Sequence, residues 1–140
     1  MIRRTKLLAL PVAALLTVLV STTASASITA LSFNSPAHLS VTNTVATVTG
    51  QVTCSTDDVA ANVFVEILQS QGRHLVIASG ETSVSCVSAG FGGITQPWTV
   101  LANTSQGQAL KTGSASIIVS ANNETFTSSK TVSGSISLTH

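Results

Sequence analysis

The chain is poor in charge, in aromatic side chains and in cysteine. Of its 140 residues, 8% are charged and the net charge is +1, whereas roughly 25% of an ordinary soluble domain is charged. Such a chain has no basic surface for nucleic acid or anionic lipid. Two cysteines are too few for a disulfide-dense miniprotein or a four-cysteine zinc site. With no Tyr and 4% aromatics, the chain also lacks the stacking rings of a single-strand nucleic-acid groove.

Residues 1–26 have the pattern of a secretory signal peptide. Three basic residues lie within positions 3–6, a 14-residue apolar stretch covers 7–20, and Ala-Ser-Ala at 24–26 matches an A-x-A cleavage site. A helix of that length spans about 21 Å, which is shorter than the roughly 30 Å core of a bilayer. We therefore expect a secreted, extracellular protein with no membrane insertion after cleavage. Three Lys or Arg then remain against five Asp or Glu, so the net charge becomes −2.

The remaining chain, 27–140, is rich in hydroxyl side chains that alternate with apolar ones. It contains 19 Ser and 16 Thr, and successive strand residues point to opposite faces of a sheet. In 45–54 one face is apolar, and it consists of Ala46, Val48, Gly50, Val52 and Cys54. In 131–139 the apolar face consists of Val132, Gly134, Ile136 and Leu138. Both runs predict strands with one buried and one wet face.

Similar runs of strand-forming residues recur along the whole chain after position 27. They predict strands at 37–41, 45–54, 62–69, 73–79, 82–87, 97–102, 114–121 and 131–139. Turn signals separate them, among them Asp57-Asp58 and Ser79-Gly80. For 73–79, the sequence leaves open whether Leu75 and Ile77 or His74 and Val76 face inward. Seven or eight short strands at this spacing indicate one antiparallel β-sandwich or barrel.

Cys54 and Cys86 both lie on faces predicted to be inward. In an oxidising compartment such a pair usually forms a disulfide. The closed loop of about 33 residues would stabilise the fold by roughly 3–4 kcal/mol. The alternative is a redox-active pair or a catalytic thiol, but the chain has no C-x-x-C spacing and no feature that activates either thiol. We therefore expect a structural disulfide.

The order of these landmarks resembles a known family. A strand ends at Cys54, the run 63–70 (VFVEILQS) follows, then come Cys86, Trp98 and the Gly-x-Ala strand at 113–115. From about position 38 to 138, the chain resembles small secreted actinobacterial proteins that carry a domain of unknown function. The resemblance implies an all-β, immunoglobulin-like antiparallel β-sandwich of about 7–8 strands with one disulfide, and it implies no activity.

Residues that could perform catalysis are sparse. The three histidines are His38, His74 and His140, and no G-x-S-x-G motif accompanies them. Glu66 and Glu81 are candidates for a pair of glycosidase acids, but each is more simply a solvent-facing strand or turn residue. Asp57-Asp58 is an acidic pair without the spacing of a calcium loop. The sequence thus predicts no enzyme, no catalytic residue, no metal site and no cofactor.

The candidate contact residues lie in a glycine-rich loop. Trp98 shares the parity of Val100 and Ala102, which favours burial. In the loop formed by Gly90, Phe91, Gly92 and Gly93, the Phe91 ring is either packed against the domain or exposed to a partner. The segments 57–61 and 122–127 are neighbours of this loop if all three lie at the same end of the domain. We expect a secreted non-enzymatic binding or structural module whose partner is an unidentified extracellular protein or small molecule. The alternative is a small-molecule carrier resembling chromoprotein apoproteins, which a large internal cavity would favour.

Overall fold

Every regular element of the described chain is a β-strand. The computed structural model describes residues 28–55, 60–86 and 94–140. The strands are β1 (Ile28–Phe33), β2 (Ala37–Leu39), β3 (Val45–Cys54), β4 (Ala60–Gln71), β5 (His74–Ser85), β6 (Ile94–Thr104), β7 (Gly113–Asn123) and β8 (Ser129–Thr139). The all-β prediction is confirmed. The predicted signal peptide at 1–26 lies outside the described residues.

The alternation of side chains predicted from the sequence is present in the strands. In β3, Val48 and Val52 are buried whereas Thr49 and Gln51 are exposed. In β7, Ile117 is buried and its neighbour Ile118 is exposed. For the run 73–79, the sequence left the inward face open. In the structure Val76 and Ala78 are buried, while Leu75 and Ile77 are exposed. One face of each strand therefore builds a common interior.

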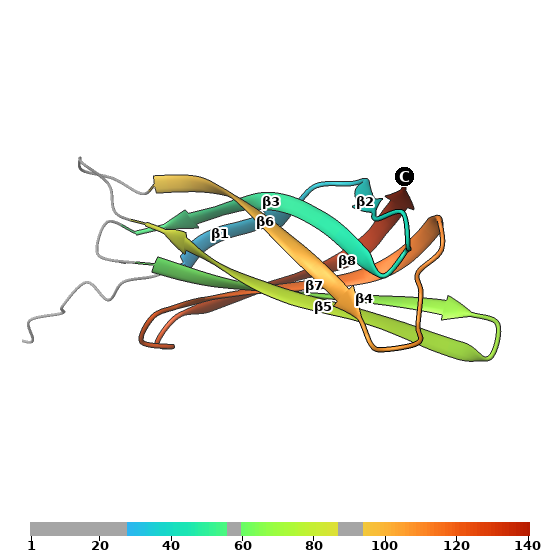
Figure 1. The fold of residues 1–140 in the computed structure, drawn as a ribbon. Helices are drawn as coiled ribbons and strands as arrows, with labels where there is room; N and C mark the ends of the chain where they lie inside the picture. Colours follow the sequence, from blue (N-terminus) through green and yellow to red (C-terminus); the bar gives the residue numbers. More distant parts are fainter. Residues whose placement is uncertain (1–27, 56–59, 87–93) are drawn as a thin grey trace, which may run out of the picture.

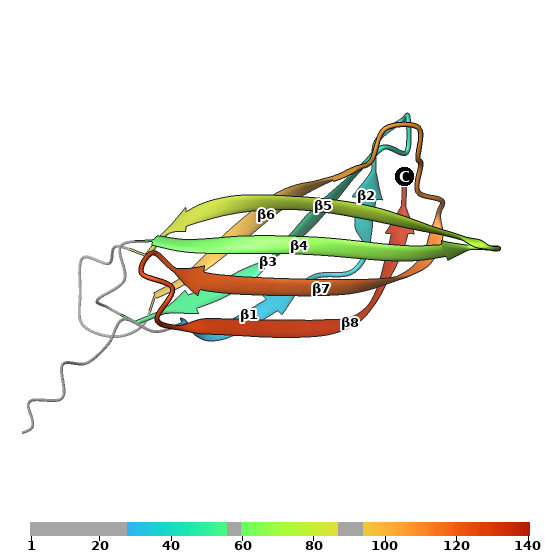
Figure 2. The same ribbon diagram turned by 90° about the horizontal axis from the view of Figure 1, so that it is seen from below.

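The strands close into a seven-stranded barrel, which corrects the prediction of an immunoglobulin-like sandwich. The ring runs β3-β2-β8-β7-β4-β5-β6 and returns to β3 through the β3–β6 pairing (Figures 1 and 2). Two short ladders complete it, since β5 pairs with β6 only at Ala78 and Ser79 and β2 pairs with β8 at Ala37 and His38. The β2–β8 pair is parallel, so the sheet is not wholly antiparallel.

The length of β5 explains why the barrel closes. The sequence predicted a turn at Ser79-Gly80, but β5 runs unbroken through both residues. Gly80 lies against the backbone of Leu101 in β6, where a Cβ atom would collide with the Leu101 carbonyl oxygen. Glycine permits this close approach of two backbones. The glycine that suggested a chain reversal thus lets one long strand pass close to the opposite half of the molecule.

The strand β1 was not predicted. It pairs with β3 from Cys54 to Gly50, on the side of β3 where β2 pairs at Thr47 and Ala46. Its burial pattern has two exposed residues in succession, Thr29 and Ala30, and its pairing with β3 shifts register there. The irregular register removes the period-two signal on which strand prediction depends.

Small aliphatic side chains fill the interior of the barrel. Trp98 is 2% exposed, which confirms its predicted place in the core, and its ring packs against Gly50. Leu110, in the segment between β6 and β7, is fully buried and its amide donates to the Asn43 carbonyl at 2.8 Å.

The buried Gln69 holds that β6–β7 segment against β4. Its Nε2 donates to the Lys111 carbonyl and its Oε1 accepts from the Lys111 amide, both at 2.8 Å. Gln71 Nε2 in turn donates to Gln69 Oε1 at 2.8 Å and to the Ala109 carbonyl at 2.9 Å. Both polar ends of the buried amide are therefore bonded, as burial of a polar group requires.

Candidate functional site

The predicted disulfide is present. Cys54, at the end of β3, is bonded to Cys86, just beyond β5, with their Cα atoms 5.9 Å apart. Both cysteines are fully buried. The bond joins β5 to β3 at the end of the barrel where β5 has parted from β6, since the β5–β6 ladder stops at Ser79. It therefore ties together strands that no backbone ladder connects at that end.

The predicted contact loop is not among the residues that the structure describes. Gly90, Phe91, Gly92 and Gly93 fall in the gap 87–93, and Asp57 and Asp58 fall in the gap 56–59. The contact role of Phe91 stays a prediction. A site must therefore be sought on the described strands and turns.

The described part of the chain contributes one cluster of buried, mostly aliphatic side chains to the interior of the barrel. The largest side chains with less than 2% exposure come from five of the strands and from the β6–β7 segment, and they include Val48, Val63, Val100, Leu110, Ile117 and Ile136. Two hollows lined by described residues lie on the outside of the sheet. The alternative of a small-molecule carrier stays a prediction.

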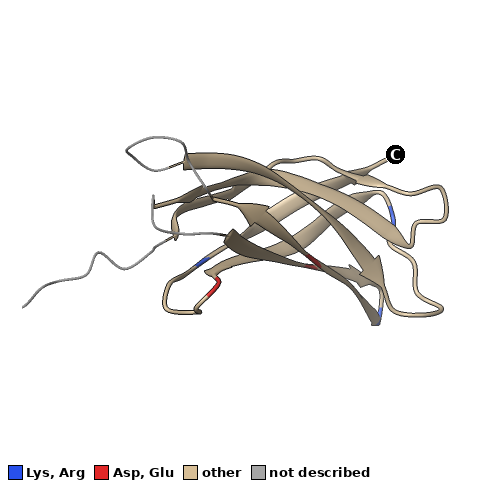
Figure 3. Cartoon of the chain, turned by 60° about the vertical axis from the view of Figure 1, so that its left-hand side comes forward, with Lys and Arg blue, Asp and Glu red and all other residues tan. Residues whose placement is uncertain are grey.

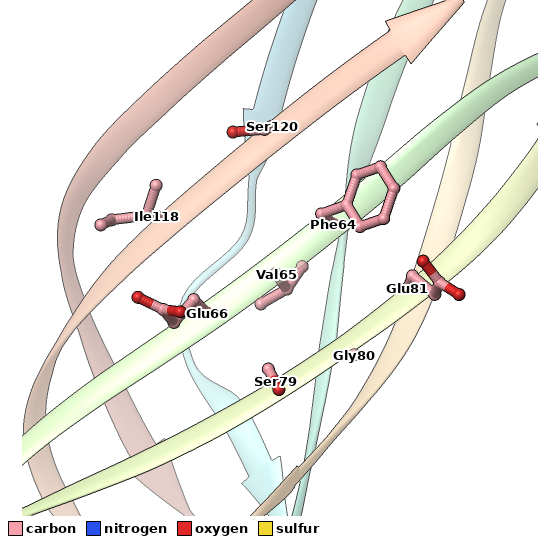
Figure 4. Close-up of a pocket in the computed structure, with 8 residues that line it drawn as sticks. All are labelled: Phe64, Val65, Glu66, Ser79, Gly80, Glu81, Ile118 and Ser120. Carbon is pink, nitrogen blue, oxygen red and sulfur yellow. The ribbon is translucent and has the colours of Figure 1, made fainter. Parts of the chain in front are cut away.

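A groove lies on the outer face of β7, β4 and β5 (Figure 4). It has a volume of about 410 Å³, within the range of small-ligand sites. We call it the outer groove, and its outward-facing lining residues are Phe64, Glu66, Ser79, Glu81, Ile118 and Ser120.

Strand register explains the composition of the outer groove. Phe64 faces Glu81 on one side and Ser120 on the other, so these three residues form one row across the sheet. In the next row, Glu66 lies between Ser79 and Ile118. Each row thus places a short serine beside longer side chains. The short serine at one end of each row leaves space beside the longer side chains.

A second hollow extends the outer groove toward the β7–β8 turn. Phe64 and Glu81 line both hollows, and the second is also lined by Phe126. The Phe126 ring is 69% exposed and its φ is 54°, a left-handed conformation that is uncommon for a bulky residue. The turn around it is well ordered by hydrogen bonds, because the Phe126 amide donates to the Asn123 carbonyl and Asn123 Nδ2 donates to Thr127 Oγ1.

The described chain carries few charged residues (Figure 3), and two acidic ones, Glu66 and Glu81, line the outer groove. Both are exposed, and neither carboxylate has a hydrogen bond or ion pair with another described residue. They are diagonal neighbours on adjacent strands, since Glu81 faces Phe64, two residues before Glu66. Positions related in this way are about 7–8 Å apart. Figure 4 shows the two carboxylates pointing away from one another.

Of the residues weighed for catalysis, Glu66 and Glu81 both line the outer groove, whereas the histidines lie elsewhere. His38, His74 and His140 are all exposed and lie on β2, at the start of β5 and at the chain end. None of them lines either hollow. Within 28–55, 60–86 and 94–140, no group of three or more His, Cys, Asp or Glu residues is placed to hold a metal ion.

Sequence reasoning missed the outer groove as a site. It gave Glu66 and Glu81 as solvent-facing strand or turn residues, and it named 122–127 only as a possible neighbour of the glycine-rich loop. What it lacked was the register that sets Glu81 beside Phe64 and Ile118 beside Glu66. The sequence did not predict that the Phe126 side chain is exposed. Its left-handed backbone conformation cannot be read from local composition.

No protein-family model matches the chain, and no curated protein matches its sequence. The resemblance drawn from Cys54, Cys86 and Trp98 therefore stays a prediction. Among the described residues there is no helix long and apolar enough to cross a membrane.

Proposed function

We propose that the protein is a secreted, non-enzymatic binding module whose ligand site is the outer groove. The observation that carries this proposal is the groove itself, where Phe64 and Ile118 lie beside two carboxylates without partners among the described residues. Binding sites combine apolar walls with a few polar groups that orient the ligand. In the outer groove, the half-buried Phe64 ring and the exposed Ile118 side chain form apolar surface next to these acids.

The proposal of secretion rests on two features. The first is the charged, apolar and small-residue pattern of residues 1–26. The second is the Cys54–Cys86 disulfide, which is compatible with an extracellular location because disulfides persist in oxidising compartments. The disulfide cross-links β3 to the end of β5, and it would stay formed in such a compartment.

The non-enzymatic part of the proposal rests on the acids. General acid–base catalysis uses groups that converge on one reacting atom, whereas the carboxylates of Glu66 and Glu81 diverge (Figure 4). No histidine lines the groove. The groove therefore has the chemistry of recognition: apolar surface, hydroxyls and negative charge.

Amide chemical-shift mapping of the ¹⁵N-labelled protein tests the proposal. The probes are small ring-bearing molecules of three kinds: cationic, neutral and anionic. We expect at least one probe to shift amides of β4, β5 and β7 around the outer groove, and Phe64→Ser to abolish that response. The matched control is Thr49→Ser, which changes an exposed residue of β3 that does not line the groove.

Two results would contradict the proposal. One is the absence of any groove response to all three kinds of probe at millimolar concentration. The other is a response confined to interior residues such as Val63 and Ile117, which would revive the carrier alternative.

A further inference from the structure

We propose that the outer groove selects small organic cations with an apolar body, such as an arylalkyl ammonium ion. This inference rests on the proposed function and names the class of ligand. It uses three properties of the groove: unpaired negative charge, a ring beside one carboxylate, and an apolar wall beside the other.

The first property is a negative charge that the chain itself does not neutralise. Glu66 and Glu81 line the groove, and none of the basic side chains of the described chain does so. Arg73 lies in the β4–β5 turn and Lys111 precedes β7. Lys130 Nζ donates to the Thr29 carbonyl at 2.8 Å, away from the groove. A cation that enters the groove thus meets two carboxylates and no competing positive charge.

The second property is the pairing of an aromatic face with a carboxylate. Phe64 lies directly across from Glu81 on adjacent strands. A cation held near Glu81 is therefore within reach of the Phe64 ring, and the faces of aromatic rings attract cations within about 6 Å. A neutral ligand can donate a hydrogen bond to the carboxylate but gains no attraction between charges, and an anion is repelled.

The third property is an apolar wall that fits the body of the ligand. Ile118 is 39% exposed on one side of Glu66, and Phe126 extends the surface beyond Glu81. Burial of apolar ligand surface against these side chains supplies affinity that is independent of charge. The groove therefore distinguishes an amphiphilic cation from a simple ion such as ammonium or sodium.

A set of three probes with the same ring tests the inference: 2-phenylethylammonium, 2-phenylethanol and phenylacetate. Dissociation constants come from amide-shift titrations of the ¹⁵N-labelled protein at low salt. We expect the cation to bind about tenfold more tightly than the alcohol, because a partly screened charge pair and a cation–ring contact act together. Phenylacetate should bind more weakly than the alcohol. Raising the salt concentration should weaken binding of the cation and leave the alcohol unaffected.

Charge-neutralising variants assign the preference to the groove. We expect Glu81→Gln and Glu66→Gln each to weaken binding of 2-phenylethylammonium by about two- to fivefold, the range of an exposed charge pair, and to leave 2-phenylethanol unchanged. Glu124→Gln is the matched control, because it removes the same charge from the β7–β8 turn and Glu124 does not line the groove. It should leave both constants unchanged.

The outcomes separate this inference from the proposed function. If the alcohol or the carboxylate binds in the groove as tightly as the cation, the cation preference is wrong and the binding module stands. If Glu124→Gln weakens cation binding as much as Glu81→Gln does, the preference comes from net charge and the inference is also overturned. If no probe shifts the groove amides, both proposals fail.

Discussion

The inner and outer faces of β4, β5 and β7 share one backbone and differ in almost everything else. On the inner face of β4, Val63, Val65 and Ile67 are buried with at most 2% exposure. On its outer face, Phe64 and Glu66 line a groove. The inner residues resemble one another in size and chemistry, whereas the outer residues include a ring, a carboxylate and, across the ladder, serines.

This difference separates stability from recognition on the same strands. Interior positions must fill space, so their replacement leaves a cavity and costs free energy of folding. Outer positions of a barrel are free of that demand, since most surface substitutions change stability little. The account therefore predicts that inner and outer variants differ in which property they change.

The largest expected loss of stability is that of Trp98→Ala. Trp98 is 2% exposed and packs against Gly50, so removal of the ring should lower the free energy of unfolding by about 3–5 kcal/mol. Urea unfolding monitored by far-ultraviolet circular dichroism measures the change. The control is Thr99→Ala, next to it on the exposed face of β6. A Trp98→Ala loss below about 1 kcal/mol would place the ring outside the core.

The next largest loss is expected when the disulfide is removed. Replacing Cys54 and Cys86 together by Ser removes a cross-link over a sequence separation of 32 residues. Chain-entropy arithmetic gives a destabilisation of roughly 3–4 kcal/mol. Thermal unfolding of the double variant measures it, and the double variant avoids a lone reactive thiol. An unchanged midpoint would mean that β3 and β5 are held together there without the bond.

Two neighbouring isoleucines give a direct inner–outer pair of smaller effect. Ile117→Val deletes a buried methyl group and should cost about 0.5–1.5 kcal/mol. Ile118→Val makes the same change at a residue that is 39% exposed, so it should stay within about 0.5 kcal/mol of the parent. Urea unfolding of both variants measures the difference. Equal losses would contradict the division between the two faces.

The smallest expected effect on stability is that of Phe126→Asn. Asn tolerates a left-handed backbone better than a bulky residue does, and the Phe126 ring is 69% exposed. The free energy of unfolding should therefore stay within about 0.5 kcal/mol of the parent or rise slightly. A loss above about 2 kcal/mol would show that the ring is part of the folded core.

The sequence predicted the strands well wherever one face was regularly apolar. The parity of β3 and the burial of Trp98 follow from period-two alternation, which is a local property of a residue and its near neighbours in the chain. The Cys54–Cys86 bond was predicted from the inward parity of both cysteines together with the expected oxidising compartment.

The features that the sequence did not predict depend on contacts between distant strands. Gly80 was interpreted as a turn because its partner, the Leu101 backbone, is not visible in the sequence. The outer groove depends on register, which places Ile118 and Glu81 on either side of β4. Closure of the barrel depends on pairings between strands far apart in the sequence, such as the short β5–β6 ladder at Ala78, and local alternation is the same in a sandwich and a barrel.

The most direct test of the division between the two faces is a methyl NMR titration of the isoleucine-labelled protein with 2-phenylethylammonium. Ile117 and Ile118 are consecutive on β7, one fully buried and one lining the outer groove. The account predicts that the Ile118 methyl signal shifts during the titration while the signals of Ile117 and Ile67 stay in place. A shift of Ile117 and Ile67 with Ile118 unmoved would place the ligand inside the barrel and contradict the account.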